Sequence, residues 1–361
     1  MTRSRKDAII AGIKVSETKH QMKRRSPWHD YRKQGIYMLT LVVEGRKPLL
    51  GRLVGRPGEK PPGTGPDPEP WVELTALGKT IRDEEIRKIG EHYQMVEVWN
   101  LCIMPDHLHM IVCVKEDMPE GKNLGQVVWG FKVGCTKAWR GSVPGGSSPV
   151  PGGSGSVPGG SSPGNKSLFE KGYNDKILQH KGQLDNWKCY LDDNPRRLAI
   201  KQQYPDLFKV VTDAFLIDTN CQTQSACQLV GNRFLFDIPQ KMAVVVHSAY
   251  SDKEYDDWRR KWLACGEAGG VLVSAAIATR EKTVIREAMD MGYSIVLLRE
   301  NGFPPLYKPA GEAFDACSRG QLLQLSPWQY HMQRKTISRE LCLQLNRLAE
   351  GIADGTITIS R

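Results

Sequence analysis

The sequence predicts an α+β protein in which a mostly antiparallel sheet backed by helices is followed by a smaller α/β domain. Strand-like and helical segments alternate over the first 200 residues, a Gly/Pro/Ser-rich stretch interrupts them, and apolar strands alternate with helices after residue 241. The 361 residues include 40% hydrophobic and 25% charged side chains, as in a soluble globular protein of two domains. We expect a basic tail at 1–26, a first domain at 27–200, a connector at 201–240 and a second domain at 241–361.

The first domain is expected to begin with a strand and a helix. "GIYMLTLVV" (35–43) is rich in β-branched and aromatic residues, which favour a strand. "LTALGKTIRDEEIRKIGEHY" (74–93) has apolar residues at helical spacing, with Thr75 as N-cap. Two strands, 94–103 and 107–114, follow around a turn at Pro105 and Asp106, and "KNLGQVVWGFKVGCTKAW" (122–139) is expected to form a second helix.

Two stretches lack the composition of a folded segment. Residues 141–166 are almost entirely Gly, Pro, Ser and Val, and "SVPGGSS" occurs in them twice. Such a sequence cannot bury a core, so we expect a flexible tether. "GRPGEKPPGTGPDPEP" (55–70) is expected to form a second loop.

The net charge of +10 is concentrated in the first part of the chain. Residues 1–200 hold 31 basic and 22 acidic side chains, and the first 33 residues alone hold 10 basic and 3 acidic ones. This distribution favours a polyanionic partner for the N-terminal part. The alternative for residues 1–25 is a solvated basic tail that binds nothing.

"MPDHLHMIVCV" (104–114) places two histidines in an otherwise apolar strand. Because side chains alternate across a strand, His107 and His109 should emerge on one face, about 6–7 Å apart at the backbone. Leu108, Met110, Val112 and Val114 would fill the opposite face. The spacing suits two ligands of one divalent metal ion, and the alternative is a pair of surface histidines.

"QLDNWKCYLDDNPRRL" (183–198) supplies further candidate site residues. Leu184, Trp187 and Leu191 recur at helical spacing and form a packing face. Tyr190 lies beside that face, and Asn194 follows one turn later. Pro195 predicts that the helix ends at Asn194. The alternative is that Tyr190 only packs at the rim of the helix.

With these two motifs in this order, residues 27–200 resemble the single-tyrosine HUH transposases, and among them the REP-associated subgroup. The resemblance rests on "MPDHLHMIV", on the Tyr-x-x-x-Asn-Pro helix and on "LFEKGYNDKIL" (168–178). It implies a ferredoxin-like antiparallel sheet with helices, the HUH domain. This chain departs from the family's pattern in two ways: it has Leu191 where the family often has Ile, and it carries the Gly/Pro/Ser-rich insertion at 141–166. That insertion leaves open whether the Tyr190 helix docks on its own sheet or on the sheet of a second copy in a homodimer.

The resemblance implies specific roles. His107 and His109, with Asn194 as third ligand, would bind Mg²⁺ or Mn²⁺, and the metal would polarise the scissile phosphate. Tyr190 would attack phosphorus to leave a 5′-phosphotyrosine and a free 3′-hydroxyl, which allows strands to be rejoined without ATP. The group that activates the phenol is not identified, and Tyr173 in "KGYND" is the alternative nucleophile.

The resemblance also implies a substrate of single-stranded DNA flanking a hairpin or palindromic repeat. The residues expected to hold DNA combine basic and aromatic side chains: Lys23, Arg24, Arg25, Trp28, Tyr31, Arg32, Lys33 and Lys132. For each basic residue the alternative is a solvated charge without a partner.

The second domain is expected to contain a parallel, Rossmann-like sheet. Strands are expected at 241–249, 270–277 and 293–300, with one helix after the capping box "SDKE" (251–254) and another at 279–291. Residues 241–325 are loosely similar, through residues 270–302, to the Rossmann-like domain of DNA-processing proteins of the DprA/SLOG type. Neither GxGxxG nor GxxxxGK[ST] is present, so we expect a structural or DNA-positioning role rather than nucleotide chemistry.

Three functions remain open from the sequence: a DNA strand transferase acting through Tyr190, a non-catalytic DNA-binding protein on the same fold, and a metal phosphohydrolase that uses water. No apolar run approaches the roughly 18 residues of a membrane span, so no membrane partner is expected. The nine cysteines are scattered without a CxxC pair, which is typical of the reducing cytoplasm.

Overall fold

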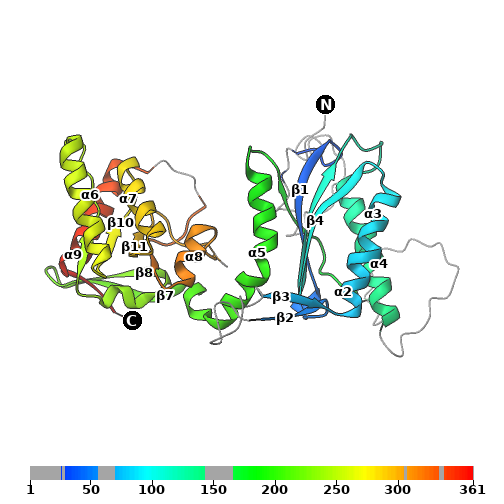
Figure 1. The fold of residues 1–361 in the computed structure, drawn as a ribbon, viewed down its shortest axis with the longest axis horizontal. Coiled ribbons are helices and arrows are strands. Elements are labelled where there is room, and N and C mark those ends of the chain that lie inside the picture. The colour runs from blue at the N-terminus through cyan, green and yellow to red at the C-terminus, as the bar shows by residue number, and fades with distance from the viewer. Residues whose placement is uncertain are drawn as a thin grey trace, which may run out of the picture. The chain divides into compact units, whose positions relative to one another are not determined.

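The computed structural model describes residue 26 and residues 29–55, 70–142, 166–304, 307–332 and 337–360. Most of the basic tail at 1–26, of the loop at 55–70 and of the tether at 141–166 lies outside these ranges. The chain divides into two compact units, Met1–Ala199 and Ile200–Arg361 (Figure 1).

Unit 1 is built around a four-stranded antiparallel sheet of order β4-β5-β1-β6. This is the order of a βαββαβ ferredoxin-like sheet, and the predicted α+β class is confirmed. The elements of this unit are β1 (Gly35–Val42), η2 (Glu44–Arg46), β2 (Gly51–Val54), β3 (Trp71–Leu74), α2 (Ala76–Thr80), η3 (Ile81–Glu85), α3 (Ile86–His92), β4 (Val96–Met104), β5 (His107–Val114), α4 (Leu124–Ser142), β6 (Asn174–Ile177) and α5 (Gln183–Gln203).

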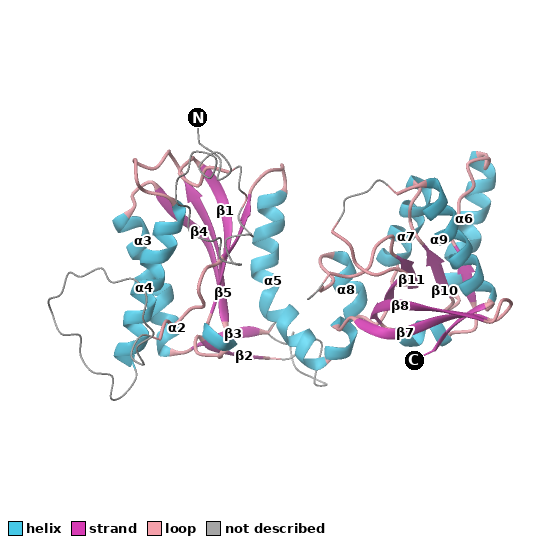
Figure 2. Cartoon of the chain, turned by 180° about the vertical axis from the view of Figure 1, so that it is seen from behind, coloured by secondary structure: helices cyan, strands magenta, loops and turns pink. Residues whose placement is uncertain are grey.

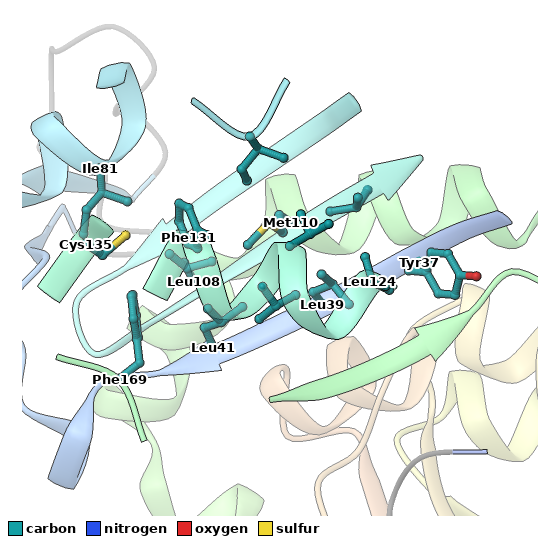
Figure 3. Packing of buried hydrophobic residues seen from close by; sticks show 14 of the residues in the cluster. Tyr37, Leu39, Leu41, Ile81, Leu108, Met110, Leu124, Phe131, Cys135 and Phe169 are labelled. Atoms are coloured by element: carbon teal, nitrogen blue, oxygen red, sulfur yellow. The ribbon is translucent and has the colours of Figure 1, made fainter. Parts of the chain in front are cut away.

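The two faces of this sheet are covered by different helices (Figure 2). On one face, Leu39 and Leu41 of β1 and Leu108 and Met110 of β5 pack against α4 and the α2–α3 helix in the main core (Figure 3). On the other face, a smaller cluster joins the sheet to α5. Because β5 alternates in this way, its two histidines lie on the face that α5 covers.

The helix expected over 74–93 forms with one irregularity. Thr75 caps it, accepting a hydrogen bond from Gly78 N at 3.1 Å. Residues Ile81–Glu85 adopt a π turn between the two α-helical parts. The antiparallel hairpin of β2 and β3 was not expected, since its strands flank the Gly/Pro-rich loop and are only four residues long.

The prediction that α5 ends at Asn194 is wrong, because the helix continues through Pro195 to Gln203. A proline inside a helix removes one N–H donor and crowds the preceding turn. Here the Asn194 side chain donates from Nδ2 to the backbone oxygen of Tyr190 at 2.9 Å. Leu191 and Ala199, on either side of the proline, are both buried. Packing therefore outweighs the local preference of the proline.

The buried phenol of Tyr37 should make unit 1 sensitive to alkaline pH. Burial, followed by the charges of Asp175 and Asp30, raises the pKa of Tyr37 from 10.0 to about 12. The folded state therefore holds this proton where the unfolded chain releases it, so the stabilisation is complete below about pH 10 and is lost as the pH rises towards about 12. We expect a loss of about 2 kcal/mol by about pH 11.5. Urea unfolding should show this loss in the wild type and a flatter pH dependence in Tyr37→Phe; equal pH dependence would contradict the assignment.

Unit 2 contains a seven-stranded sheet of order β13-β7-β8-β12-β11-β10-β9. Strands β9, β10 and β11 are parallel, as predicted; β12 adds a further parallel strand that was not predicted, and β8, β7 and β13 continue the sheet in antiparallel fashion. The elements are η4 (Pro205–Phe208), β7 (Val211–Asp218), β8 (Thr223–Gly231), η5 (Arg233–Asp237), β9 (Lys241–Ala243), α6 (Asp252–Glu267), β10 (Val271–Ser274), α7 (Thr279–Asp290), β11 (Ser294–Leu298), α8 (Glu312–Ser318), β12 (Leu322–Ser326), α9 (Arg339–Asp354) and β13 (Ile357–Ser360).

The connector expected at 201–240 is instead part of this sheet. Strand β8 pairs with β12 through Leu323 opposite Gly231, and Leu229 in β8 is fully buried. Strands β7 (VTDAFLID) and β8 (TQSACQLVG) mix apolar and polar residues without a regular alternation, so the local pattern was not recognised as strands; long-range pairing stabilises both. The capping box predicted before α6 is present, with Ser251 and Glu254 bonded reciprocally. None of the helices in the described ranges is both long and apolar enough to span a bilayer.

Gly231 is a position in unit 2 where a side chain should not be tolerated. Its φ is +116°, and a Cβ would lie 2.1 Å from the backbone oxygen of Leu322. We expect Gly231→Ala to cost about 3 kcal/mol or more, because neither backbone can shift without breaking the β8–β12 pairing. Gly355 also has a positive φ, +83°, but has nothing within 4 Å of the added Cβ. Gly355→Ala should therefore cost only about 1 kcal/mol in thermal unfolding. Equal losses in both variants would refute this explanation.

Candidate active site

The two histidines of β5 lie side by side on the face covered by α5. The centroids of the His107 and His109 rings are 4.9 Å apart and the ring planes are nearly perpendicular. His109 is buried, and the side chain of His107 is 18% exposed. Alternation along the strand thus produces the shared face that the sequence predicts.

Each imidazole has a neighbour at Nδ1. His107 Nδ1 lies 2.6 Å from Asp106 Oδ1, and His109 Nδ1 lies 2.8 Å from the hydroxyl oxygen of Thr40, directly opposite on β1. With Nδ1 engaged in both rings, a metal ion would be bound through Nε2, as is common for histidine ligands whose other nitrogen is hydrogen-bonded.

Asp106 is itself held by a second residue. Arg46 Nη1 lies 3.1 Å from Asp106 Oδ2. Burial acts to raise the pKa of Asp106, but the hydrogen bond and charge of His107, together with those of Arg46, outweigh it and leave the pKa below its ordinary value. The carboxylate is therefore ionised at neutral pH.

Helix α5 brings Tyr190 to this pair. Trp187 and Leu191 pack with Met38 and Ile111, which fixes α5 on the sheet of its own chain. Tyr190, beside this packing face, has its ring centroid 5.6 Å from that of His109 and is 36% exposed. The phenol therefore lies beside the histidines and is partly exposed to solvent.

Arg197 lies beneath the tyrosine on the same helix. Its side chain is 7% exposed, its guanidinium carbon is 5.7 Å from the Tyr190 ring centroid, and Nη1 is 3.6 Å from Asp193. Burial raises the pKa of Tyr190 above its ordinary value, and the charge of Arg197 is the largest influence opposing that rise.

The donors near Tyr190 fit a hard divalent cation in part. The described residues contain no group of three or more His, Cys, Asp or Glu side chains arranged to hold a metal ion. A cation at the two imidazoles would thus need further oxygen ligands. Asn194 is buried one turn after Tyr190, and since its Nδ2 is committed to the helix, Oδ1 is the atom with which it would bind. Two imidazoles and an amide oxygen form a neutral set that leaves positions for phosphate oxygens.

The alternative nucleophile Tyr173 lies elsewhere. It precedes β6 and packs against the main core, on the face of the sheet opposite the histidines. It is therefore separated from His107 and His109 by the sheet itself, whereas Tyr190 lies on their face.

The residues predicted to contact DNA differ in what the structure shows of them. Lys23, Arg24, Arg25 and Trp28 lie outside the described residues. Tyr31 donates its hydroxyl to Asp175 at 2.6 Å. Arg32 pairs with Asp30, and Lys33 with Asp117, both at the surface. Surface pairs open readily, so Arg32 and Lys33 stay predicted contacts.

The position and contacts of Lys132 do not support its predicted role as a DNA contact. It lies on α4, which covers the face opposite the histidines, and its ammonium donates to the backbone oxygens of Glu170 and Gly172. Burial lowers the pKa of Lys132. This side chain ties α4 to the segment that precedes β6.

Four residues of the site were not identified from the sequence: Thr40, Arg46, Asp106 and Arg197. Asp106 lies within the histidine motif, and Arg197 lies seven residues after Tyr190 on the same side of the helix, so both had a sequence signal. Thr40 and Arg46 are brought to the histidines only by the register of β1 with β5 and by the turn after β1.

No family profile and no curated protein sequence matches the chain. Among solved structures, it is similar to a REP-associated tyrosine transposase bound to a REP hairpin, with 16% identity and a TM-score of 0.29, covering 50% of this chain and 73% of that one. It is also similar to DNA processing protein A from Helicobacter pylori, a structure that describes a single-stranded DNA binding mode. That match has 16% identity and a TM-score of 0.27, and it covers 36% of this chain and 57% of that one.

Proposed function

We propose that this protein is a single-stranded DNA endonuclease and strand transferase, a transposase that cuts DNA through a covalent 5′-phosphotyrosine at Tyr190. The observation that carries the proposal is the placement of an accessible phenol 5.6 Å, ring to ring, from His109 in a pair of adjacent imidazoles. A nucleophile beside a metal-binding pair is the arrangement that phosphodiester transfer needs.

In the proposed reaction Tyr190 Oη attacks the scissile phosphorus. A bond from Oη to phosphorus forms, the bond from phosphorus to the 3′-oxygen breaks, and that oxygen takes up a proton as the phenol loses one. A divalent cation held by His107, His109 and Asn194 would polarise the phosphate and offset charge on its oxygens. Arg197, with its positive charge beneath the ring, would favour the ionised phenol. Attack by a second 3′-hydroxyl then reverses the chemistry and releases Tyr190.

The proposed substrate is an accessible single strand next to a hairpin. The excess of basic over acidic side chains in residues 1–200, 31 against 22, supports a nucleic-acid partner for this part of the chain. Arg32 and Lys33 with Tyr31, and the aromatic and basic residues at 23–28, are the proposed contacts.

A pair of end-labelled oligonucleotides tests this function. The DNA would copy short imperfect palindromes from the flanks of the gene, with single-stranded arms, and would be incubated with the protein and Mn²⁺. The proposed polarity transfers a 3′-end label to the protein and releases a 5′-end label on a fragment with a free 3′-hydroxyl. Cleavage without attached label would favour water as the nucleophile, and binding without any cleavage would favour a non-catalytic protein.

A further inference from the structure

Arg46 and the two consecutive residues Asp106 and His107 form a continuous series of contacts that ends at one imidazole. Arg46 lies in the short turn after β1, Asp106 in the turn before β5, and His107 at the first position of β5. Arg46 Nη1 is 3.1 Å from Asp106 Oδ2, and Asp106 Oδ1 is 2.6 Å from His107 Nδ1. Both oxygens of the carboxylate are thus engaged, one by a cation and one by the ring.

The backbone at Arg46 is unusual. Gly45 and Arg46 have φ of +68° and +52°, so two consecutive residues lie in the left-handed region. Glycine is suited to that conformation, whereas arginine is strained in it. The Arg46 side chain is 64% exposed, and an exposed ion pair adds little stability. Neither burial nor the small stability gained from the exposed ion pair with Asp106 accounts for a strained arginine here. A functional role of that same contact with Asp106 does account for it.

The chemistry of the contacts indicates what that role is. An ionised carboxylate only accepts hydrogen bonds, so Asp106 requires the proton of His107 to be on Nδ1. Nε2 then carries the lone pair that a divalent cation needs. The Thr40 hydroxyl beside His109 Nδ1 can donate or accept, so this contact alone does not fix a tautomer of His109.

We propose that Asp106 and Arg46 are positioning residues that hold His107 in its Nδ1–H tautomer and thereby prepare the site for a divalent cation. The inference rests on the proposed function only in taking His107 as a metal ligand. Asp106 sets the tautomer, and Arg46 fixes the plane of the carboxylate through its second oxygen.

The test uses the full chain with Asp106→Asn, Arg46→Gln and a matched control, Arg52→Gln. Arg52 also forms an exposed ion pair, with Glu73, but it lies in β2 and has no contact with the histidines. Long-range ¹H–¹⁵N spectra of the metal-free protein report the tautomer of His107, and titration with Mn²⁺ alone reports the affinity for the metal ion.

We expect a single Nδ1–H form of His107 in the wild type and a mixture of tautomers in Asp106→Asn. The Mn²⁺ affinity should fall about 10–100-fold in Asp106→Asn and by a smaller factor in Arg46→Gln. Arg52→Gln should match the wild type.

A further variant, Arg46→Gly, separates positioning from stability. Glycine relieves the left-handed backbone, so its melting temperature should not fall, while its Mn²⁺ affinity should fall as in Arg46→Gln. An unchanged tautomer and unchanged Mn²⁺ affinity in Asp106→Asn would overturn the proposal. If Asp106→Asn fails to fold, unchanged affinity in both Arg46 variants would overturn it equally. Because neither readout needs DNA, a wild-type protein that binds Mn²⁺ as described but forms no adduct would refute the proposed function alone.

Discussion

Tyr190→Phe should abolish transfer of a 3′-end label from single-stranded DNA to the protein. The phenylalanine ring keeps the packing beside His109 but has no oxygen with which to form the phosphodiester, so the loss should be at least about a thousandfold. Denaturing gels of protein incubated with labelled DNA and Mn²⁺ measure this directly. DNA binding should be retained, because Tyr190 is one residue of a larger proposed contact surface.

Tyr173→Phe is the matched control for this result. It removes the same atom from a tyrosine that packs against the main core on the opposite face of the sheet. We expect label transfer in this variant to remain near the wild-type level. Full transfer in Tyr190→Phe together with loss in Tyr173→Phe would reverse the assignment of the nucleophile.

His109→Ala should lower adduct formation at least about a hundredfold and weaken Mn²⁺ binding. Loss of a hydrogen-bonded partner of a metal ligand commonly costs 10–100-fold, and loss of the ligand itself should cost more. His109 is also the imidazole nearest Tyr190, so its removal separates the nucleophile from the proposed cation. Adduct formation should be followed over a range of Mn²⁺ concentrations, since a binding defect is partly overcome by excess metal.

His92→Ala controls for the loss of an imidazole. His92 is exposed at the end of α3, which packs on the face of the sheet opposite the site. It should leave both Mn²⁺ affinity and adduct yield unchanged. If His109→Ala also left Mn²⁺ affinity unchanged, the proposed metal site would be wrong even if an adduct formed.

The histidine face and the α5 packing face could be predicted because both follow from local periodicity. Alternation along a strand places His107 with His109, and helical spacing places Trp187 with Leu191. Neither pattern predicts which helix covers which strand. That relation depends on the register of β1 against β5 and on long-range packing, which a single sequence does not encode in a readable form.

The errors arose where tertiary contacts overrode a local preference. Pro195 disfavours a helix, yet packing on both sides and the Asn194 side chain maintain one. Strands β7 and β8 lack a regular apolar–polar alternation, yet β7 pairs with β13 and β8 pairs with β12. Lys132 had the residue type of a DNA contact, but its ammonium binds two backbone oxygens instead. Residue type alone did not distinguish these cases.

The most direct test of the central claim is to map the residue that carries DNA. The adduct formed with single-stranded DNA and Mn²⁺ would be digested with nuclease and trypsin and analysed by mass spectrometry. Tyr190 and Tyr173 fall in separate tryptic peptides, residues 189–196 and 172–176. The account predicts a nucleotide attached through phosphate to Tyr190 in the first peptide. Attachment at Tyr173, or cleaved DNA with no modified tyrosine, would contradict it.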